Sequence, residues 1–254
     1  MKRITYHAGN SILHRLHPLA KGAWLVAGTI LLFVVRIPWA VLAATALLVA
    51  AFPLARLPLV RTRGIRTLGL TALLLALLQI AFVRRGPVVA RLGPLTLTQG
   101  GLEAGTYVAG RFTSAVLLSY LYVLTTDPND LAYALMRAGL PYRYGFALIS
   151  ALRLVPTFEQ EGQIVYHAQL ARGVRYDVRS PRRFLTLARQ FFLPLLVSAL
   201  GKVDALAVSM EGRCFGKYPT RTFLRQARWT GRDGAAMAVL AAVVAAGIGG
   251  VLSS

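Results

Sequence analysis

Hydrophobic residues gather in five long runs along the chain. The runs cover residues 22–35, 37–55, 68–83, 104–125 and 235–252. A helix needs about 20 residues, with a range of about 17 to 25, to cross the hydrocarbon core of a bilayer. The first run is short and is expected to borrow residues from Leu19 onward. The pattern therefore predicts an all-α, polytopic membrane protein with about five transmembrane helices.

Two further apolar segments, residues 144–174 and 182–215, carry a charge every turn or two. Each charge would cost about 2.5 to 3.5 kcal/mol at the bilayer centre on insertion scales. We therefore expect two long amphipathic helices at the cytoplasmic boundary. Pro156 and Pro194 each remove a backbone hydrogen bond and are expected to kink these helices. Ser180, which precedes a proline, is placed to cap the second helix.

Both amphipathic segments end in a small residue, an arginine and another small residue. The first cluster is Ala171, Arg172 and Gly173, and the second is Gly212, Arg213 and Cys214. A glycine suits the left-handed cap of a helix and an arginine complements the helix dipole, so an ordinary helix end explains either cluster by itself. The occurrence of similar clusters on two helices at one membrane face favours a role for these arginines beyond the termination of a helix.

Basic residues are unevenly distributed, with 29 Lys and Arg against 9 Asp and Glu and a net charge of +20. They concentrate in the N-terminal segment, in the loop after the second run and in residues 127–233. These regions share one side of the bilayer if there are five spans, and positively charged loops stay cytoplasmic. This predicts a cytoplasmic N-terminus, a membrane domain at 1–126, a cytoplasmic region at 127–233 and a final transmembrane helix within 234–254. Arg84 and Arg85 depart from the rule.

The positive charge requires a negative partner, for which anionic lipid headgroups and acidic proteins are candidates. Nucleic acid is a poor candidate because the arginines lie in short clusters, without a basic helix or an aromatic platform. The single cysteine, Cys214, excludes an intramolecular disulfide. The bilayer is therefore the first expected partner.

Groups for membrane-embedded chemistry are scarce. Between residues 22 and 126 the only acid is Glu103, and there is no histidine. No phosphate-binding loop of the Gly-Lys-Ser type occurs, so ATP binding in that manner is excluded. His7, His14 and His17 lack the carboxylates or thiolates that would complete a metal site. We expect no enzyme activity, no cofactor and no metal.

Several motifs resemble those of the T component, the transmembrane coupling subunit of energy-coupling factor transporters. Residues 11–18 read Ser-Ile-Leu-His-Arg-Leu-His-Pro and are followed by Lys21, which is similar to the family's N-terminal signature. Residues 126–131, 140–141, 152–157, 168–173 and 210–216 resemble its central block and second coupling motif in order and spacing. The resemblance covers nearly the whole chain.

The resemblance implies a complex with two ABC-type ATPase subunits and a small substrate-binding membrane protein, the S component, in the plasma membrane of a prokaryote. Two cytoplasmic coupling helices would dock into grooves on the ATPases and carry their movement to the S component, for uptake of a vitamin or a transition-metal ion. By position, Arg172 and Arg213 would insert into the grooves, with Ala171, Gly173, Gly212 and Cys214 beside them.

Two positions depart from the family pattern. His17 stands where the family usually has Asp, and Cys214 stands where the second motif usually has Gly. Three alternative functions make different demands on the sequence: a self-sufficient secondary transporter, a lipid-modifying membrane enzyme and a membrane-surface scaffold. The first requires a buried carboxylate and the second a polar catalytic cluster, whereas the third requires salt-sensitive lipid binding without an ATPase partner.

Overall fold

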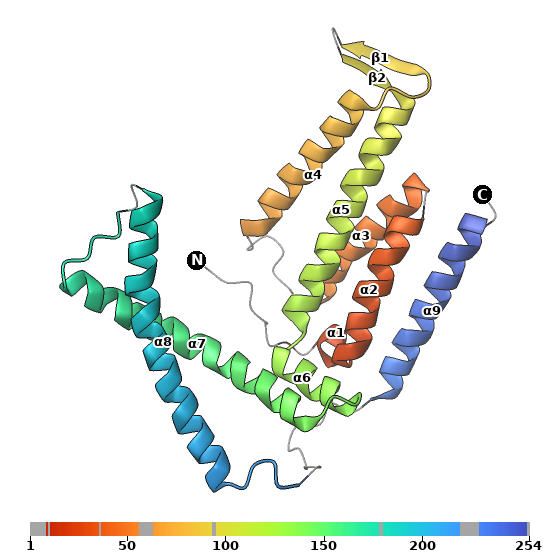
Figure 1. The fold of residues 1–254 in the computed structure, drawn as a ribbon. Coiled ribbons are helices and arrows are strands. Elements are labelled where there is room, and N and C mark those ends of the chain that lie inside the picture. Colours follow the sequence, from red (N-terminus) through yellow and green to blue (C-terminus); the bar gives the residue numbers. More distant parts are fainter. Residues whose placement is uncertain are drawn as a thin grey trace. The chain divides into compact units, whose positions relative to one another are not determined.

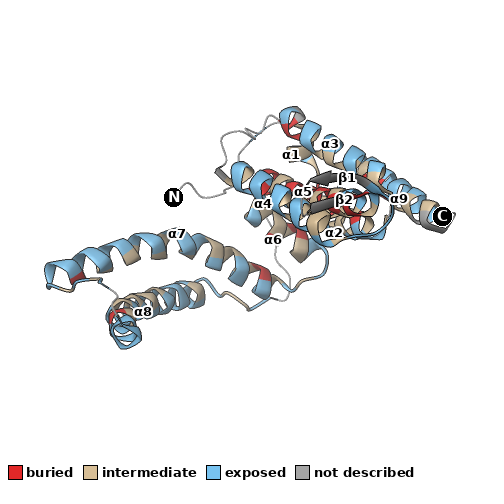
Figure 2. Ribbon diagram, turned by 90° about the horizontal axis from the view of Figure 1, so that it is seen from above, coloured by how far each residue is buried: buried red, intermediate tan, exposed pale blue. Residues whose placement is uncertain are grey.

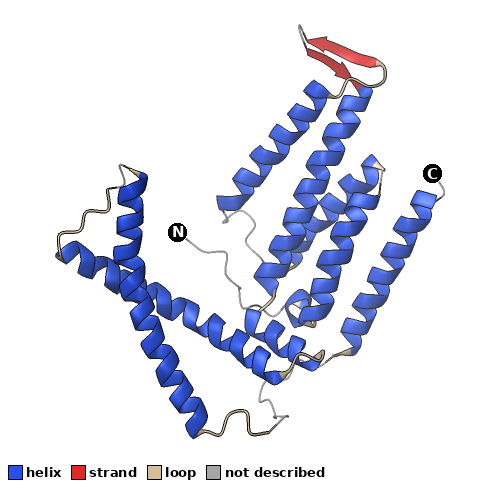
Figure 3. Cartoon of the chain, in the orientation of Figure 1, coloured by secondary structure: helices blue, strands red, loops and turns tan. Residues whose placement is uncertain are grey.

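The computed structural model describes residues 9, 11–35, 37–55, 63–92, 95–177, 180–218 and 229–252. Its helices are α1 (Ile12–Arg15), α2 (Pro18–Val34), α3 (Pro38–Leu54), α4 (Arg63–Phe82), α5 (Gln99–Thr125), α6 (Pro128–Arg137), α7 (Tyr142–Ala171), α8 (Pro181–Gly212) and α9 (Gly231–Leu252) (Figure 1). Most of the described chain is helical (Figure 3), which confirms the all-α class. Most of the basic loop after the second hydrophobic run, residues 56–62, lies outside the described residues.

One short antiparallel hairpin was not predicted. It joins β1 (Val88–Leu92) to β2 (Leu95–Thr98), with Arg91 opposite Thr96 and Leu92 opposite Leu95. The sequence of β2 alternates leucine and threonine, as a strand does, and the dipeptide Gly93-Pro94 that precedes it in the sequence is a turn signal. The hairpin connects α4 to α5, and α5 begins five residues before the fourth hydrophobic run.

The chain divides into two compact units. The first comprises residues 1–134 and 227–254, and the second comprises residues 135–226. In the first unit, α2, α3 and α4 pack on α5, and α9 packs on α2. In the second unit, α7 packs on α8. Helix α6 begins in the first unit and ends in the second.

Small residues on α5 allow its neighbours to approach closely. A Cβ atom on Gly105 would lie 3.0 Å from the carbonyl oxygen of Ala76 in α4. A Cβ atom on Gly110 would lie 2.7 Å from Val41 Cγ1 in α3. Helices packed at such distances gain van der Waals contacts, which stabilise helix association within a bilayer. Helix α5 is therefore the centre of the first unit.

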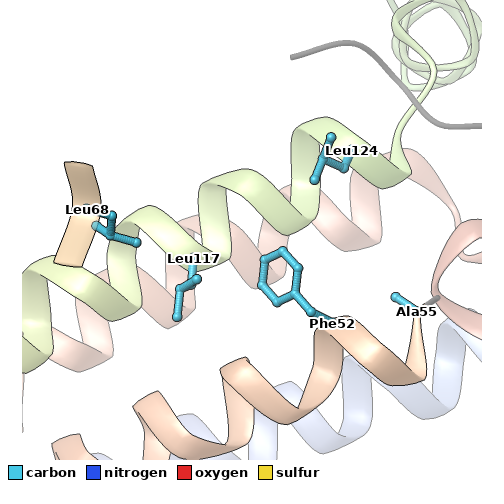
Figure 4. Packing of buried hydrophobic residues seen from close by; sticks show 5 residues of the cluster. All are labelled: Phe52, Ala55, Leu68, Leu117 and Leu124. Atoms are coloured by element: carbon cyan, nitrogen blue, oxygen red, sulfur yellow. The ribbon is translucent and has the colours of Figure 1, made fainter. Parts of the chain in front are cut away.

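The apolar core of the first unit lies between α3, α4 and α5. Phe52 and Ala55, at the end of α3, face Leu117 and Leu124 of α5, and Leu68 of α4 completes the cluster (Figure 4). Phe52 and Leu117 are each 2% exposed. Figure 2 shows buried residues on α5 and few on α7 and α8. Among the described residues, most of the buried side chains therefore belong to the first unit.

Apolar helices lie at all five predicted hydrophobic runs, namely α2, α3, α4, α5 and α9. Within the residues that the structure describes, three helices are long and apolar enough to cross a membrane: Gly64–Phe82, Gln99–Thr125 and Pro181–Gly212. Helices α2 and α3 have 17 residues each, at the lower end of the spanning range. The chain is thus a polytopic membrane protein. Because α8 also meets the length and composition criteria, its assignment as a boundary helix stays a prediction.

Candidate functional site

Helix α7 ends in a hydrogen-bonded turn that places Arg172 at the surface. Arg172 is the C-cap residue, with φ −81° and ψ 6°, and Gly173 follows with φ +81°. The Gly173 N–H donates to the Leu170 carbonyl at 2.9 Å, and the Val174 N–H donates to the Gln169 carbonyl at 3.0 Å. These two bonds define a Schellman motif, with glycine in the left-handed position.

Helix α8 ends in the same turn, although its sequence differs. Arg213 is the C-cap residue, with φ −100° and ψ 15°, and Cys214 follows with φ +51°. The Cys214 N–H donates to the Glu211 carbonyl and the Phe215 N–H to the Met210 carbonyl, both at 2.9 Å. Each donor and acceptor occupies the position of its counterpart at the end of α7. The two arginine clusters therefore share one backbone geometry.

The departure at Cys214 leaves the turn unchanged. Among the described residues, Cys214 is the one non-glycine residue with positive φ. A left-handed conformation costs an L-residue roughly 1 to 2 kcal/mol, because its Cβ approaches the following carbonyl oxygen. Arg172, Arg213 and Cys214 are all exposed. Both guanidinium groups are therefore presented at the surface by a fixed helix end.

Polar contacts join the second half of α7 to α8. Glu161 accepts a hydrogen bond from Lys202 Nζ at 2.7 Å and from Ser198 Oγ at 3.0 Å. These bonds hold the pKa of the Glu161 carboxyl below its ordinary value. Gln169 donates from Nε2 to the Gln190 carbonyl at 3.0 Å, while its own carbonyl accepts from Val174. Gln169 thus ties the turn that presents Arg172 directly to α8.

The second arginine cluster is held at the beginning of α7. The Phe215 ring lies 4.6 Å from the ring of Phe146 and 5.5 Å from that of Tyr142. Arg143 Nη2 donates to the Gly216 carbonyl at 3.3 Å. Helix α7 has 30 residues and is therefore about 45 Å long. Since one cluster lies at each end of α7, the two arginines are separated by roughly that length.

The two prolines predicted as kink sites lie inside the helices. Pro156 is within α7 and Pro194 within α8. Each lacks the N–H that would bond to the carbonyl four residues earlier. The expected kinks stay a prediction, since the structure establishes only the positions of the prolines.

Helix α8 presents a large uncovered apolar surface. Leu187 is its one buried residue, whereas Leu185 is 67% exposed and Val197 is 66% exposed. A cavity of about 510 Å³ lies beside Phe158 of α7, lined by Phe192, Leu193 and Leu196 of α8. Apolar patches of this extent on a protein mark a membrane or protein interaction site. The α7–α8 pair is therefore incomplete without a covering partner or lipid.

Residues of the N-terminal signature form hydrogen bonds that connect α2 to α5 and α9 in the first unit. His17 is the N-cap of α2, and its Nδ1 accepts from the Leu19 N–H at 3.3 Å. The N–H of His17 donates to Asp233 Oδ1 at 2.6 Å. Lys21 Nζ donates to the Thr125 carbonyl at the end of α5, at 2.8 Å. His17 thus performs at the helix start the capping role for which Asp is equally suited.

Asp233 is fully buried at the start of α9. Its second carboxylate oxygen accepts from the N–H of Thr230 at 2.8 Å and from the Thr230 hydroxyl at 2.7 Å. Burial raises the pKa of this carboxyl, but the bonds from His17 and Thr230 outweigh that effect and the pKa lies below its ordinary value. The His17 ring also stacks on Trp229, with centroids 4.5 Å apart. This cluster links residues more than 200 positions apart, which no local pattern could predict.

The histidines considered for a metal site have other contacts. His14 Nδ1 lies 2.6 Å from Ser11 Oγ in a hydrogen bond, and His17 makes the capping and stacking contacts described above. His7 lies outside the described residues.

Arg111, within α5, is a functional candidate that the hydrophobic pattern left unnoticed. Its Nη2 donates to the Val35 carbonyl at 2.7 Å, and its guanidinium carbon lies 4.9 Å from the centroid of the Tyr107 ring. An arginine inside a predicted span is costly and for that reason commonly functional. Its presence in the run 104–125 was the available signal.

Known proteins resemble this chain over most of its length. The family model described as cobalt transport protein matches residues 9–223. Proteins named energy-coupling factor transporter transmembrane protein EcfT are similar as well. The one from Thermosediminibacter oceani is 31% identical, with 98% of this chain and 96% of the relative covered. The one from Streptococcus equi subsp. equi is 30% identical, with 90% of this chain and 88% of the relative covered. The one from Limosilactobacillus fermentum is 31% identical, with 92% of this chain and 91% of the relative covered.

Proposed function

This chain belongs to the family of transmembrane proteins of energy-coupling factor transporters, and from this premise we propose that it transmits ATP-driven movement to a substrate-binding subunit. The chain is a transport component of a membrane complex. In the proposal, two ABC-type ATPase subunits hydrolyse ATP, and a small membrane-embedded S component binds a vitamin or a transition-metal ion. The complex lies in the plasma membrane of a prokaryote, with the N-terminus and the α7–α8 pair at the cytoplasmic face.

The observation that carries the proposal is the repeated turn. Two helices end in the same Schellman geometry, each with an exposed arginine at the C-cap position. An ordinary helix end requires neither the arginine nor the strained Cys214 that preserves the turn in α8. The duplication supports two equivalent binding partners, each of which accepts one arginine.

Arginine is well suited to such docking. Its planar guanidinium binds a carboxylate and backbone carbonyls in one groove, which lysine does poorly. The residues beside Arg172 and Arg213 are small, so a partner's backbone can approach closely. Because the two arginines are separated by roughly the length of α7, about 45 Å, the proposed occupants are two ATPase subunits and not two sites on one small domain.

The uncovered surface of α8 supports the second half of the proposal. An S component that lies on the apolar face around Phe192 and Val197 would cover it and would move with the helices. Since Glu161 and Gln169 bond α7 to α8, a displacement at either arginine would be passed to both helices.

The proposal is tested by purification of the tagged chain from its native membranes, with identification of the proteins that accompany it. We expect two P-loop ATPases and a small membrane protein with the wild type, and loss of the ATPases with Arg172→Ala/Arg213→Ala. Arg182→Ala, an exposed arginine of α8 outside both clusters, is the matched control and is expected to retain them. A double mutant that keeps its ATPases and transports normally would refute the proposal. If the wild-type chain transports substrate without partners, a secondary transporter is favoured. If it only binds anionic lipid, a membrane-surface scaffold is favoured.

A further inference from the structure

A groove of about 720 Å³ runs along one side of α5 in the first unit. Its walls come from α2, α4 and α5 and include Phe33, Leu75, Val108 and Val116. Phe33 is 59% exposed and Val123, at one end, is 44% exposed, so the groove is open along its length. Its volume is within the range of small-molecule sites, about 300 to 1,000 Å³. An apolar channel of this kind, on a helix that crosses the bilayer, suits a hydrocarbon chain.

The one charged group among the residues that line this groove is Arg111. Its Nη2 is occupied by the Val35 carbonyl, whereas its Nε is buried and has no hydrogen-bond partner in the described part of the chain. A guanidinium has five N–H donors and accepts none, so its remaining donors require an acceptor. No acidic side chain lines the groove, so its own lining supplies no carboxylate for the remaining donors of Arg111.

The level of Arg111 in the bilayer indicates which chemical group accepts from its remaining N–H donors. It bonds to Val35, the C-cap residue at which α2 ends. Backbone that leaves helical geometry is not tolerated against hydrocarbon, so this level is close to one surface of the bilayer. Phospholipid phosphates lie at that level, and their oxygens bind a guanidinium in bidentate fashion.

We propose that the groove along α5 binds an anionic phospholipid, with the phosphate on Arg111 and an acyl chain along Val116, Ser119 and Val123. The lipid lies in the leaflet at which α2 ends. It supplies an acceptor to the guanidinium and fills part of the groove along α5. The proposal concerns the first unit alone and does not depend on the docking of ATPases at Arg172 and Arg213.

The test is to count lipids retained by the purified full-length protein, in its complex, by native mass spectrometry after addition of phosphatidylglycerol or phosphatidylcholine. We expect the wild type to bind phosphatidylglycerol about tenfold more tightly, and Arg111→Gln to lose that preference, because a charge-assisted bond is lost. Ser119→Trp, which fills the groove but leaves Arg111 on Val35, is expected to lose both lipids. Arg84→Gln, an exposed arginine outside the groove, is the matched control.

Three results would overturn the proposal. The first is equal binding of the two lipids by the wild type, a comparison that does not depend on the folding of any variant. The second is undiminished retention of phosphatidylglycerol by folded Arg111→Gln or Ser119→Trp. The third is release of a partner membrane protein by Ser119→Trp with an unchanged lipid count, which would assign the groove to a helix of that partner.

Discussion

The two compact units of this protein differ in what stabilises their helices. In the first unit, α3, α4 and α5 bury apolar side chains such as Phe52 and Leu117 between them. In the second unit, the contacts between α7 and α8 include the polar bonds of Glu161 and Gln169, while the apolar side chains of α8 are largely exposed. Both units expose apolar side chains, such as Leu47 in the first and Leu185 in the second, but the first unit also buries an apolar cluster between its helices, whereas Leu187 is the one buried residue of α8.

This difference fits different roles for the two units. A densely packed unit has few alternative arrangements, since each would open cavities. A pair of helices with few buried contacts and several polar ones changes its arrangement at a smaller cost in free energy. The first unit is thus suited to serve as the frame in the membrane, and the second to transmit movement in the proposed complex.

The largest expected effect is a break in the core of the first unit. Phe52→Ala removes a ring that is 2% exposed and is expected to lower the free energy of unfolding by about 3 to 5 kcal/mol. The equivalent change in the second unit, Phe192→Ala, removes a ring that is 62% exposed and is expected to change it by less than about 0.5 kcal/mol. Denaturant unfolding of the purified protein in detergent measures both values.

Similar losses for the two phenylalanine variants would contradict the contrast between the units. The assembled complex provides the converse comparison, because a partner on α8 would bury Phe192. There Phe192→Ala is expected to weaken retention of the S component, while the protein alone is unaffected.

An intermediate effect is expected at Asp233, whose hydrogen bond with His17 links α9 to α2. Asp233→Asn leaves a capping side chain but removes the charge that accepts from His17 and Thr230, at an expected cost of about 1 to 2 kcal/mol. The Asp233 pKa in the folded protein lies below its ordinary value of 3.8, so the carboxylate stabilises the fold above that pH. This contribution is lost as pH falls through the folded pKa. Between pH 6 and about pH 3, the stability of the variant should therefore decrease less than that of the wild type.

A wild type whose acid sensitivity equals that of Asp233→Asn would show that other carboxylates dominate this pH range. Thr230→Val, which removes one hydroxyl donor and keeps the carboxylate, is the matched control. It should lose stability and, because one of the bonds that lower the Asp233 pKa is gone, show an acid sensitivity between those of the wild type and Asp233→Asn.

Local chemistry predicted much of the framework. The five hydrophobic runs lie in helices α2, α3, α4, α5 and α9. Ser180 caps α8 as predicted, accepting from the Arg183 N–H at 3.3 Å. These features depend on residues within one or two turns, whose spacing is visible in the sequence. The similar ends of α7 and α8 were predictable for the same reason.

Contacts between distant residues were not predictable. Asp233 could be identified as a first-turn acid, but its bond to His17 requires that α2 and α9 lie side by side. Arg111 could be seen as a charge in an apolar run, but its bond to Val35 depends on the packing of α2 on α5. A hydrophobic pattern shows which residues are apolar and does not show which helices are neighbours. The exposure of α8 is likewise a property of the packing.

The smallest effects are expected at the C-terminal ends of α7 and α8. The comparison here is between two helices of the second unit. Cys214→Gly relieves the left-handed strain but adds freedom to the unfolded chain, for an expected net gain of about 0.5 to 1 kcal/mol. Gly173→Ala is expected to cost about 1 kcal/mol, since φ is +81° there. Hydrogen exchange at the amides of Phe215 and Val174, the closing donors of the two turns, measures each effect separately. Cys214→Ala keeps the Cβ and should exchange like the wild type, so faster exchange at Phe215 in that variant would show that the thiol stabilises the end of α8, and faster exchange in Cys214→Gly would contradict the expected gain.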